Sequence, residues 1–208
     1  MTVKKGILSR GILASVGLAA VASLGFAGIA AAAVGPDQPG HPASGTLTIN
    51  KYKGNYTETP ADKDKLNGVE FIVQQVGELD GATCVPIDLT FPAGWDQVAD
   101  FIPASGIKTD PPASPYCLVP GTQQTEVTED GKAVFNLPLG LYYVQEGADN
   151  GNNNIVDKAQ PFYVTIPMAI PPAEGQQRGD YDWNYTPVVN PKNATSEAPN
   201  KQVTDPQP

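Results

Sequence analysis

Short stretches in which apolar and polar residues alternate recur along the chain, and this alternation is the period of a strand with one buried face. Turns rich in Gly, Pro, Asn and Asp separate them. The stretches cover residues 46–53, 68–76, 125–137, 140–148, 160–168 and 182–193. The third contains Glu-Asp-Gly-Lys, a sequence that predicts a tight hairpin turn. Short strands joined by such turns predict an all-β fold, an antiparallel β-sandwich.

The N-terminal 33 residues do not follow this pattern. Three basic residues precede a long apolar run, and the run ends in small residues at Ala31 and Ala33. This order predicts a secretory signal peptide over residues 1–33, with cleavage after Ala33. The apolar run is long enough to span a membrane, so a retained anchor is the alternative. The polar leader at 34–45 favours cleavage.

Charge and histidine content exclude several classes of function. The net charge of the whole chain is −9, and residues 1–33 contribute three positive charges and no negative one, so the mature chain stands near −12. An acidic secreted protein repels nucleic acid and anionic lipid. The sole histidine, His41, lies in the leader and is too isolated to act as a catalytic base. We therefore expect no enzyme that turns over, no metal and no cofactor.

Residues 77–123 are rich in Pro and Gly and contain both cysteines, Cys84 and Cys117. An even pair of cysteines in an exported chain predicts a disulfide. A metal or redox pair is disfavoured because the CxxC spacing is missing. We expect this segment to be an elaborated connection pinned by the disulfide rather than a second domain, and its best helix candidate covers residues 94–102.

Two charged residues occupy positions where alternation predicts apolar ones. Lys51 continues the inward face of Leu47 and Ile49, and Glu146 continues that of Tyr142 and Val144. A buried charge is costly unless it is paired, so the two form either a buried ion pair or a reactive pair. Burial lowers the pKa of a lysine and raises that of a glutamate. If an asparagine lies beside them, the neutral amine can attack its Cγ and expel ammonia, forming an isopeptide bond.

The order of these residues resembles a known type of domain. The segments GVEFIV, EDGKAVFNLPLGLYYVQE and PFYVTI resemble the B-type domains of collagen adhesins (Cna-B), which are Ig-like β-sandwiches. The resemblance runs from Thr46 to Asn193 and leaves out the 77–123 insertion. It implies an intramolecular bond between Lys51 and Asn193, with Glu146 handling the proton. Lys53 is a second candidate for the amine.

The last stretch resembles the pilin motif of sortase-assembled Gram-positive pili. The residues that match are Trp183, Val189, Pro191, Lys192 and Asn193. Pro187 stands where the motif usually has a valine, and Asn190 where it usually has a tyrosine. The resemblance implies that Lys192 is the acceptor amine for linkage between subunits. Proline locks φ, so Pro191 is expected to fix the backbone that presents this lysine.

These observations predict the N-terminal domain of a pilus subunit, with a signal peptide at 1–33, a leader at 34–45, a β-sandwich at 46–193 and a tail at 194–208. The resemblance implies a location on the cell wall of a Gram-positive bacterium. The implied partners are other pilin subunits, a pilus-specific sortase and a host surface ligand. We expect a longer native chain to carry the sorting signal. The alternative is an adhesin module of the cell wall that does not polymerise.

Overall fold

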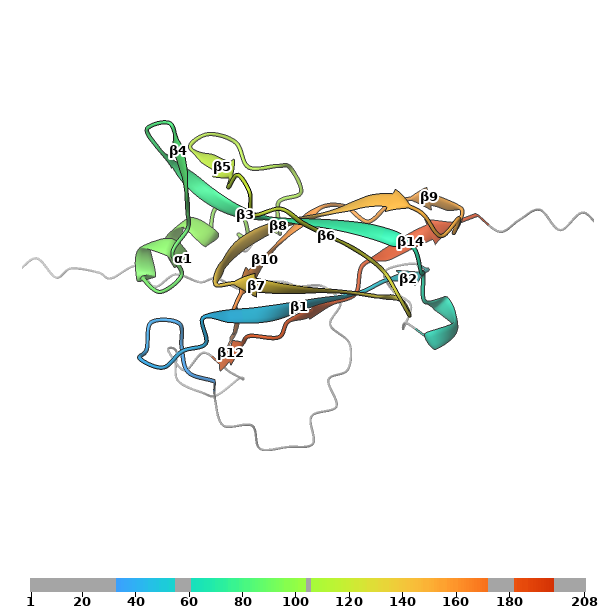
Figure 1. The fold of residues 1–208 in the computed structure, drawn as a ribbon, viewed down its shortest axis with the longest axis horizontal. Coiled ribbons are helices and arrows are strands. Elements are labelled where there is room, and N and C mark those ends of the chain that lie inside the picture. The colour runs from blue at the N-terminus through green and yellow to red at the C-terminus, as the bar shows by residue number, and fades with distance from the viewer. Residues whose placement is uncertain (1–32, 55–60, 104–105, 172–181, 197–208) are drawn as a thin grey trace, which may run out of the picture.

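Two sheets face each other across an apolar core in the computed structural model, which describes residues 33–54, 61–103, 106–171 and 182–196 (Figure 1). The predicted signal peptide lies outside the described residues except for Ala33. Antiparallel pairing dominates, so the predicted all-β sandwich is confirmed.

The first sheet has the strand order β13-β1-β7. Its strands are β1 (Ser44–Asn50), β7 (Lys132–Pro138) and β13 (Val188–Val189). β1 pairs antiparallel with β7 and parallel with β13, so the beginning and the end of the domain lie side by side.

The second sheet has the order β10-β8-β3-β4, and two further strands also pair with β3. Its strands are β3 (Val69–Asp80), β4 (Thr83–Pro86), β5 (Tyr116–Leu118), β6 (Gln124–Val127), β8 (Gly140–Asp149) and β10 (Phe162–Ile166). The long strand β3 joins the sandwich to the insertion, because its first half pairs with β6 and β8 and its second half with β4 and β5.

Two small sheets complete the fold. They contain β2 (Tyr52–Lys53), β9 (Ile155–Asp157) and β14 (Lys192–Thr195) in one, and β11 (Met168–Ile170) and β12 (Asp182–Asn184) in the other. β14 lies between β2 and β9 and pairs parallel with β2. A 3₁₀ helix, η1, covers Asp62–Asp64.

Two of the predicted strands are broken. The stretch 182–193 forms three separate short strands, because Pro187 and Pro191 have no N–H to donate to a ladder. Both prolines still accept hydrogen bonds through their carbonyl oxygens, from the amides of Thr48 and Tyr52. The stretch 46–53 is likewise divided into β1 and β2.

The predicted hairpin turn is present, but its two strands separate. Asp130 and Gly131 both have positive φ, 48° and 70°, as a type I′ turn requires. Glu129 and Lys132 exchange two backbone hydrogen bonds of 2.9 Å. Beyond that pair β6 joins β3 and β7 joins β1, so the turn links the two sheets.

The core between the sheets contains the residues that alternation predicted to point inward. Leu47 and Ile49 of β1 pack with Phe71 and Val73 of β3 and with Val144 of β8. All five side chains are buried. This core fixes the registers of β1 and β8, because a shift of one residue would move their apolar side chains to the wrong face.

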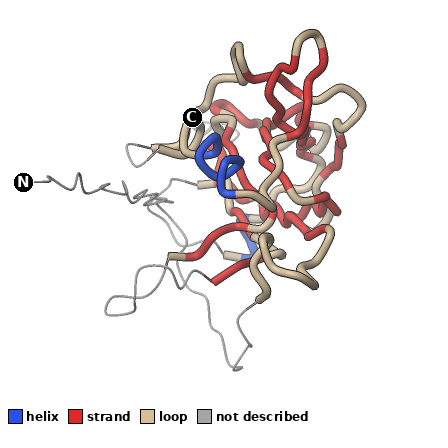
Figure 2. The backbone as a smooth tube through the Cα atoms, turned by 90° about the vertical axis from the view of Figure 1, so that its left-hand side faces the viewer, coloured by secondary structure: helices blue, strands red, loops and turns tan. Residues whose placement is uncertain are grey.

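The insertion forms its own apolar cluster on the outer face of the second sheet. Helix α1 (Pro92–Val98) overlaps the predicted range 94–102 but begins and ends earlier, with proline in its first turn. The cluster contains Val76, Ile87, Leu89, Val98, Phe101, Ile102, Leu141, Tyr143 and Tyr163. The second sheet is therefore covered on both faces here. Figure 1 shows α1 and β4 at one end of the sandwich, and Figure 2 views the molecule from that end.

The predicted disulfide between Cys84 and Cys117 is present. It joins β4 to β5, which both pair with the second half of β3. The disulfide therefore connects the two ends of the loop that carries α1.

Candidate functional site

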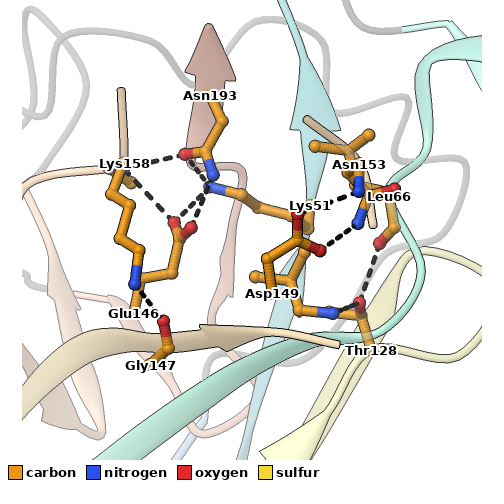
Figure 3. Close-up of polar contacts among 11 residues, drawn as sticks. Lys51, Leu66, Thr128, Glu146, Gly147, Asp149, Asn153, Lys158 and Asn193 are labelled. Carbon is orange, nitrogen blue, oxygen red and sulfur yellow. Dashed lines mark hydrogen bonds and ion pairs between the residues drawn. The ribbon is translucent and has the colours of Figure 1, made fainter. Parts of the chain in front are cut away.

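Three polar side chains from distant parts of the sequence meet at one end of the core. Lys51 lies between β1 and β2, Glu146 lies in β8 and Asn193 lies in β14 (Figure 3). The position of Lys51 follows from β1, whose alternation continues inward after Leu47 and Ile49. The pairing of β14 with β2 brings Asn193 next to the backbone that follows Lys51.

The three side chains form a closed set of hydrogen bonds. Lys51 Nζ donates to Glu146 Oε2 at 2.7 Å and to Asn193 Oδ1 at 2.5 Å. Asn193 Nδ2 donates to Glu146 Oε1 at 2.5 Å. The two carboxylate oxygens of Glu146 therefore contact two different nitrogens, the amine of the lysine and the amide nitrogen of the asparagine.

This triad is removed from water. The side chains of Lys51 and Glu146 are 0% and 1% exposed, and Asn193 is 0% exposed. Phe71 lies against the amine, with Nζ 5.6 Å from the ring centroid. Burial lowers the pKa of Lys51 from 10.5 to about 8, although the hydrogen bond and the charge of Glu146 act in the opposite direction. Near neutral pH, a fraction of the molecules therefore has a neutral Lys51 amine.

The geometry suits amide exchange. An amine can act as a nucleophile only as its neutral form, and an amide nitrogen leaves as ammonia only if it receives a proton. Glu146 can accept a proton from Nζ through Oε2 and deliver one to Nδ2 through Oε1. The carboxyl group thus connects the nucleophile with the leaving group.

The residues of the C-terminal motif are spread along the molecule. Figure 1 shows β12, which carries Trp183, near the insertion, and β14, which carries Lys192, at the opposite end. The rings of Trp183 and Trp95 of α1 lie 5.1 Å apart. Val189 belongs to the main core. Pro191 directly precedes β14 and is half-buried.

Lys192 is more enclosed than its place in the sequence suggested. The sequence places it at the end of the last predicted strand, 182–193, where a lysine is expected to reach solvent, but the residue is only 7% exposed. The expectation was wrong because β14 does not end there: it continues to Thr195 and lies between β2 and β9. Lys192 is adjacent in sequence to Asn193, whose side chain belongs to the triad.

Comparison with known families decides the class of this protein. The family described as Gram-positive pilin subunit D1, N-terminal domain, matches residues 40–194. The chain belongs to this family. This pilin domain is therefore a cell-surface fimbrial protein of the Gram-positive type.

Individual relatives are similar to this chain over part of their length. The fimbrial subunit type 2 of Actinomyces naeslundii is 30% identical over 214 residues, which cover 91% of this chain and 37% of the relative. The chain thus spans little more than a third of that relative's length. Among solved structures, the full-length major pilin SpaD of Corynebacterium diphtheriae is 27% identical, with 73% of this chain and 30% of that chain covered and a TM-score of 0.40. The major pilin SpaA of the same organism is 25% identical, with the same coverage and a TM-score of 0.45.

The structure of the pilin domain distinguishes Lys51 from Lys53, the two candidates for the amine of the intramolecular bond. Lys53 was a second candidate because alternation placed it inward, but its side chain is 50% exposed and its Nζ lies 3.9 Å from Asp64 Oδ1. It lies beyond the end of β1, where the core no longer covers that face. Asn190, which stands where the motif usually has a tyrosine, accepts a hydrogen bond from Asn50 and lies outside the triad.

Two contacts of the pilin domain had no signal in the sequence. The backbone N–H of Ala159 donates to Asn193 Oδ1 at 2.7 Å, and a main-chain donor can be provided by any residue except proline. The ring of Trp95, which belongs to the insertion, packs against the ring of Trp183. The family resemblance did not cover the insertion, so this contact could not be expected from it. Within the part of the chain that the structure describes, no helix is long and apolar enough to cross a membrane.

Proposed function

We propose that this domain belongs to the structural subunit of a covalently polymerised surface pilus and that Lys192 is the acceptor amine for linkage between subunits. The observation that carries the proposal is the match to the pilin family over residues 40–194, a range that includes Lys192 and Asn193. The partners are a pilus-specific sortase and further pilin subunits. A host surface ligand is a further candidate partner.

The linkage is an acyl transfer to the lysine. The sortase holds the C-terminal threonine of another subunit as a thioester. The neutral amine of Lys192 attacks the thioester carbonyl, an amide bond forms, and the sortase thiol leaves with a proton from the amine. The domain contributes the nucleophile and its presentation, while the sortase contributes the activated carbonyl. No turnover by the pilin itself is required.

The enclosure of Lys192 adds a condition to this reaction. With only 7% of the residue exposed, a local rearrangement would bring the amine of Lys192 within reach of a thioester. We infer that binding of the sortase uncovers the amine by moving the lysine, the start of β14 or its neighbours. Formation of the linkage therefore depends on recognition of the folded domain and not only on the presence of a lysine.

We also propose that Lys51 and Asn193 form an intramolecular isopeptide bond with the help of Glu146. The short contacts and the burial of the three side chains support it. The net reaction joins Nζ to Cγ and releases the amide nitrogen as ammonia. Such a bond ties the first strand of the domain to the last, next to the acceptor lysine.

A matched pair of variants tests the acceptor role. In a strain that carries the full-length gene, Lys192→Arg keeps the positive charge but removes the nucleophile, because a guanidinium stays protonated. We expect the ladder of high-mass species in cell-wall extracts to disappear on denaturing gels while the monomer remains. Lys132→Arg, in the exposed position on β7, is the control and should keep the ladder.

Persistence of the ladder in the Lys192→Arg strain would show that another residue accepts the linkage. Absence of a ladder even with the unchanged gene would favour the adhesin module that does not polymerise.

A further inference from the structure

The amide oxygen of Asn193 accepts two hydrogen bonds, one from Lys51 Nζ and one from the backbone. The proton transfer from Lys51 to Glu146 gives no role to the second. The main-chain N–H of Ala159 donates to Oδ1 at 2.7 Å and also lies 3.2 Å from Glu146 Oε2. Ala159 is buried. The N–H therefore points into the triad at the atom on which negative charge develops when Cγ is attacked.

The fold holds this N–H in place from both sides. Ala159 lies in the short link between β9 and β10. β9 pairs with β14, the strand that carries Asn193, and β10 pairs with β8, the strand that carries Glu146. The donor is thus tied to both side chains through sheet pairing, and no side-chain freedom is lost when it acts.

The roles of the two donors on Oδ1 change during the reaction. Nζ donates to this oxygen while it is protonated, but it must present its lone pair to Cγ in order to attack. Among the contacts of the described residues, the Ala159 N–H is then the donor that remains on Oδ1. When Glu146 has taken up the proton, its Oε2 becomes a weaker acceptor, which leaves this N–H available to the oxyanion.

We propose that the main-chain N–H of Ala159 is the oxyanion donor for formation of the Lys51–Asn193 bond, an inference that rests on the proposed intramolecular bond. Nζ first passes a proton to Glu146. The amine then attacks Cγ, and the π electron pair of the carbonyl moves to Oδ1, where the N–H of Ala159 stabilises it. The pair returns as the bond from Cγ to Nδ2 breaks, Nδ2 takes the proton from Glu146 and leaves as ammonia, and Nζ gives a second proton to Glu146.

An amide-to-ester replacement tests this role because it removes the N–H and keeps the alanine methyl group. The whole chain is made by cell-free translation with L-lactic acid in place of Ala159, collected in denaturant and folded by dilution. The loss of about 17 Da, one ammonia, is followed by intact mass. We expect the rate of this loss to fall about 100-fold or more, as it does when one oxyanion donor is removed from an enzyme.

Two controls separate the N–H from packing. The same ester at Ala148, whose N–H donates to Glu70 at 3.4 Å outside the triad, should leave the rate unchanged. Ala159→Gly keeps the N–H and should retain most of the rate. If the ester at Ala159 reacts as fast as the unchanged chain, the oxyanion role is refuted while the bond itself stands. If the unchanged chain never loses ammonia, the proposed bond fails and the inference falls with it.

A second measurement does not depend on the folding of the ester. In the unreacted Glu146→Gln chain, the amide proton of Ala159 should resonate downfield and exchange slowly. Asn193→Ala in that background should move it upfield and speed its exchange. An unchanged resonance would show that this N–H does not bind the Asn193 amide in solution.

Discussion

Glu146→Gln is the substitution that most cleanly separates the cross-linked domain from the same fold without the bond. Glutamine has nearly the shape of glutamate, but it cannot carry a proton from Nζ to Nδ2. The chain should therefore keep its ammonia and weigh about 16 Da more than the cross-linked wild type, since retained ammonia adds about 17 Da and the change from glutamate to glutamine removes about 1 Da. The contacts of Glu146 with Lys51 and Asn193 are the ones that this change weakens.

The magnitude of the stability change follows from the length of chain that the bond closes. Lys51 and Asn193 are 142 residues apart in sequence. The chain-entropy relation gives about 5 kcal/mol at 25 °C for a cross-link over this span. The disulfide within the span shortens the loop, but the logarithmic dependence changes the value by only about 0.2 kcal/mol. For a domain of this size the loss corresponds to a fall in Tm of about 10–20 °C.

Intact mass and differential scanning calorimetry of the two purified chains measure both effects. Glu70→Gln is the matched control, since Glu70 is a half-buried carboxylate on the same sheet that lies outside the triad. It should leave the mass loss intact and change the free energy of unfolding by about 0.5 kcal/mol or less. A Glu146→Gln chain that is about 1 Da lighter than the wild type and has the same Tm would show that the wild type carries no such bond.

Two further predictions concern the disulfide and the amine. Replacing Cys84 and Cys117 together by alanine should lower the free energy of unfolding by about 4 kcal/mol, measured with urea, because 33 residues separate the two; no change in the urea midpoint would contradict this. The rate of ammonia loss should be constant below pH 8 and fall about tenfold per pH unit above it. The pKa of Lys51 is lowered to about 8, so above that pH the pair with Glu146 has lost the proton that the leaving nitrogen needs. A rate that rises between pH 7 and pH 9 would instead indicate a reaction limited by the free amine alone.

Alternation was sufficient to place Lys51 and Glu146 inside the core. The period of a strand is two, and the apolar neighbours Leu47, Ile49 and Val144 set the inward face without reference to any other part of the chain. The asparagine could be chosen only through the family resemblance, because the pairing of β14 with β2 depends on contacts between the two ends of the domain.

The exposure of Lys53, the enclosure of Lys192 and the packing of the insertion on β8 depend on tertiary contacts, which the alternation of apolar and polar residues cannot predict. Alternation assigns Lys53 to the same face as Lys51, but the core ends between them, so Lys51 is buried and the side chain of Lys53 is half-exposed. Lys192 lies near the end of the last predicted strand, yet β2 and β9 pair with β14 on its two sides and the residue is buried. The outer face of β8 is covered because the insertion packs on Tyr143, and the alternating pattern of the sandwich does not predict where an insertion folds back.

The role proposed for Lys192 as acceptor of the bond between subunits is tested by the position of the branch in native fibres. High-mass polymers from the cell wall are digested, and branched peptides are sequenced by tandem mass spectrometry. We expect a peptide in which the ε-nitrogen of Lys192 is bonded to the C-terminal threonine of a second subunit. Polymers whose branches lie on another lysine, with Lys192 recovered unmodified, would contradict it.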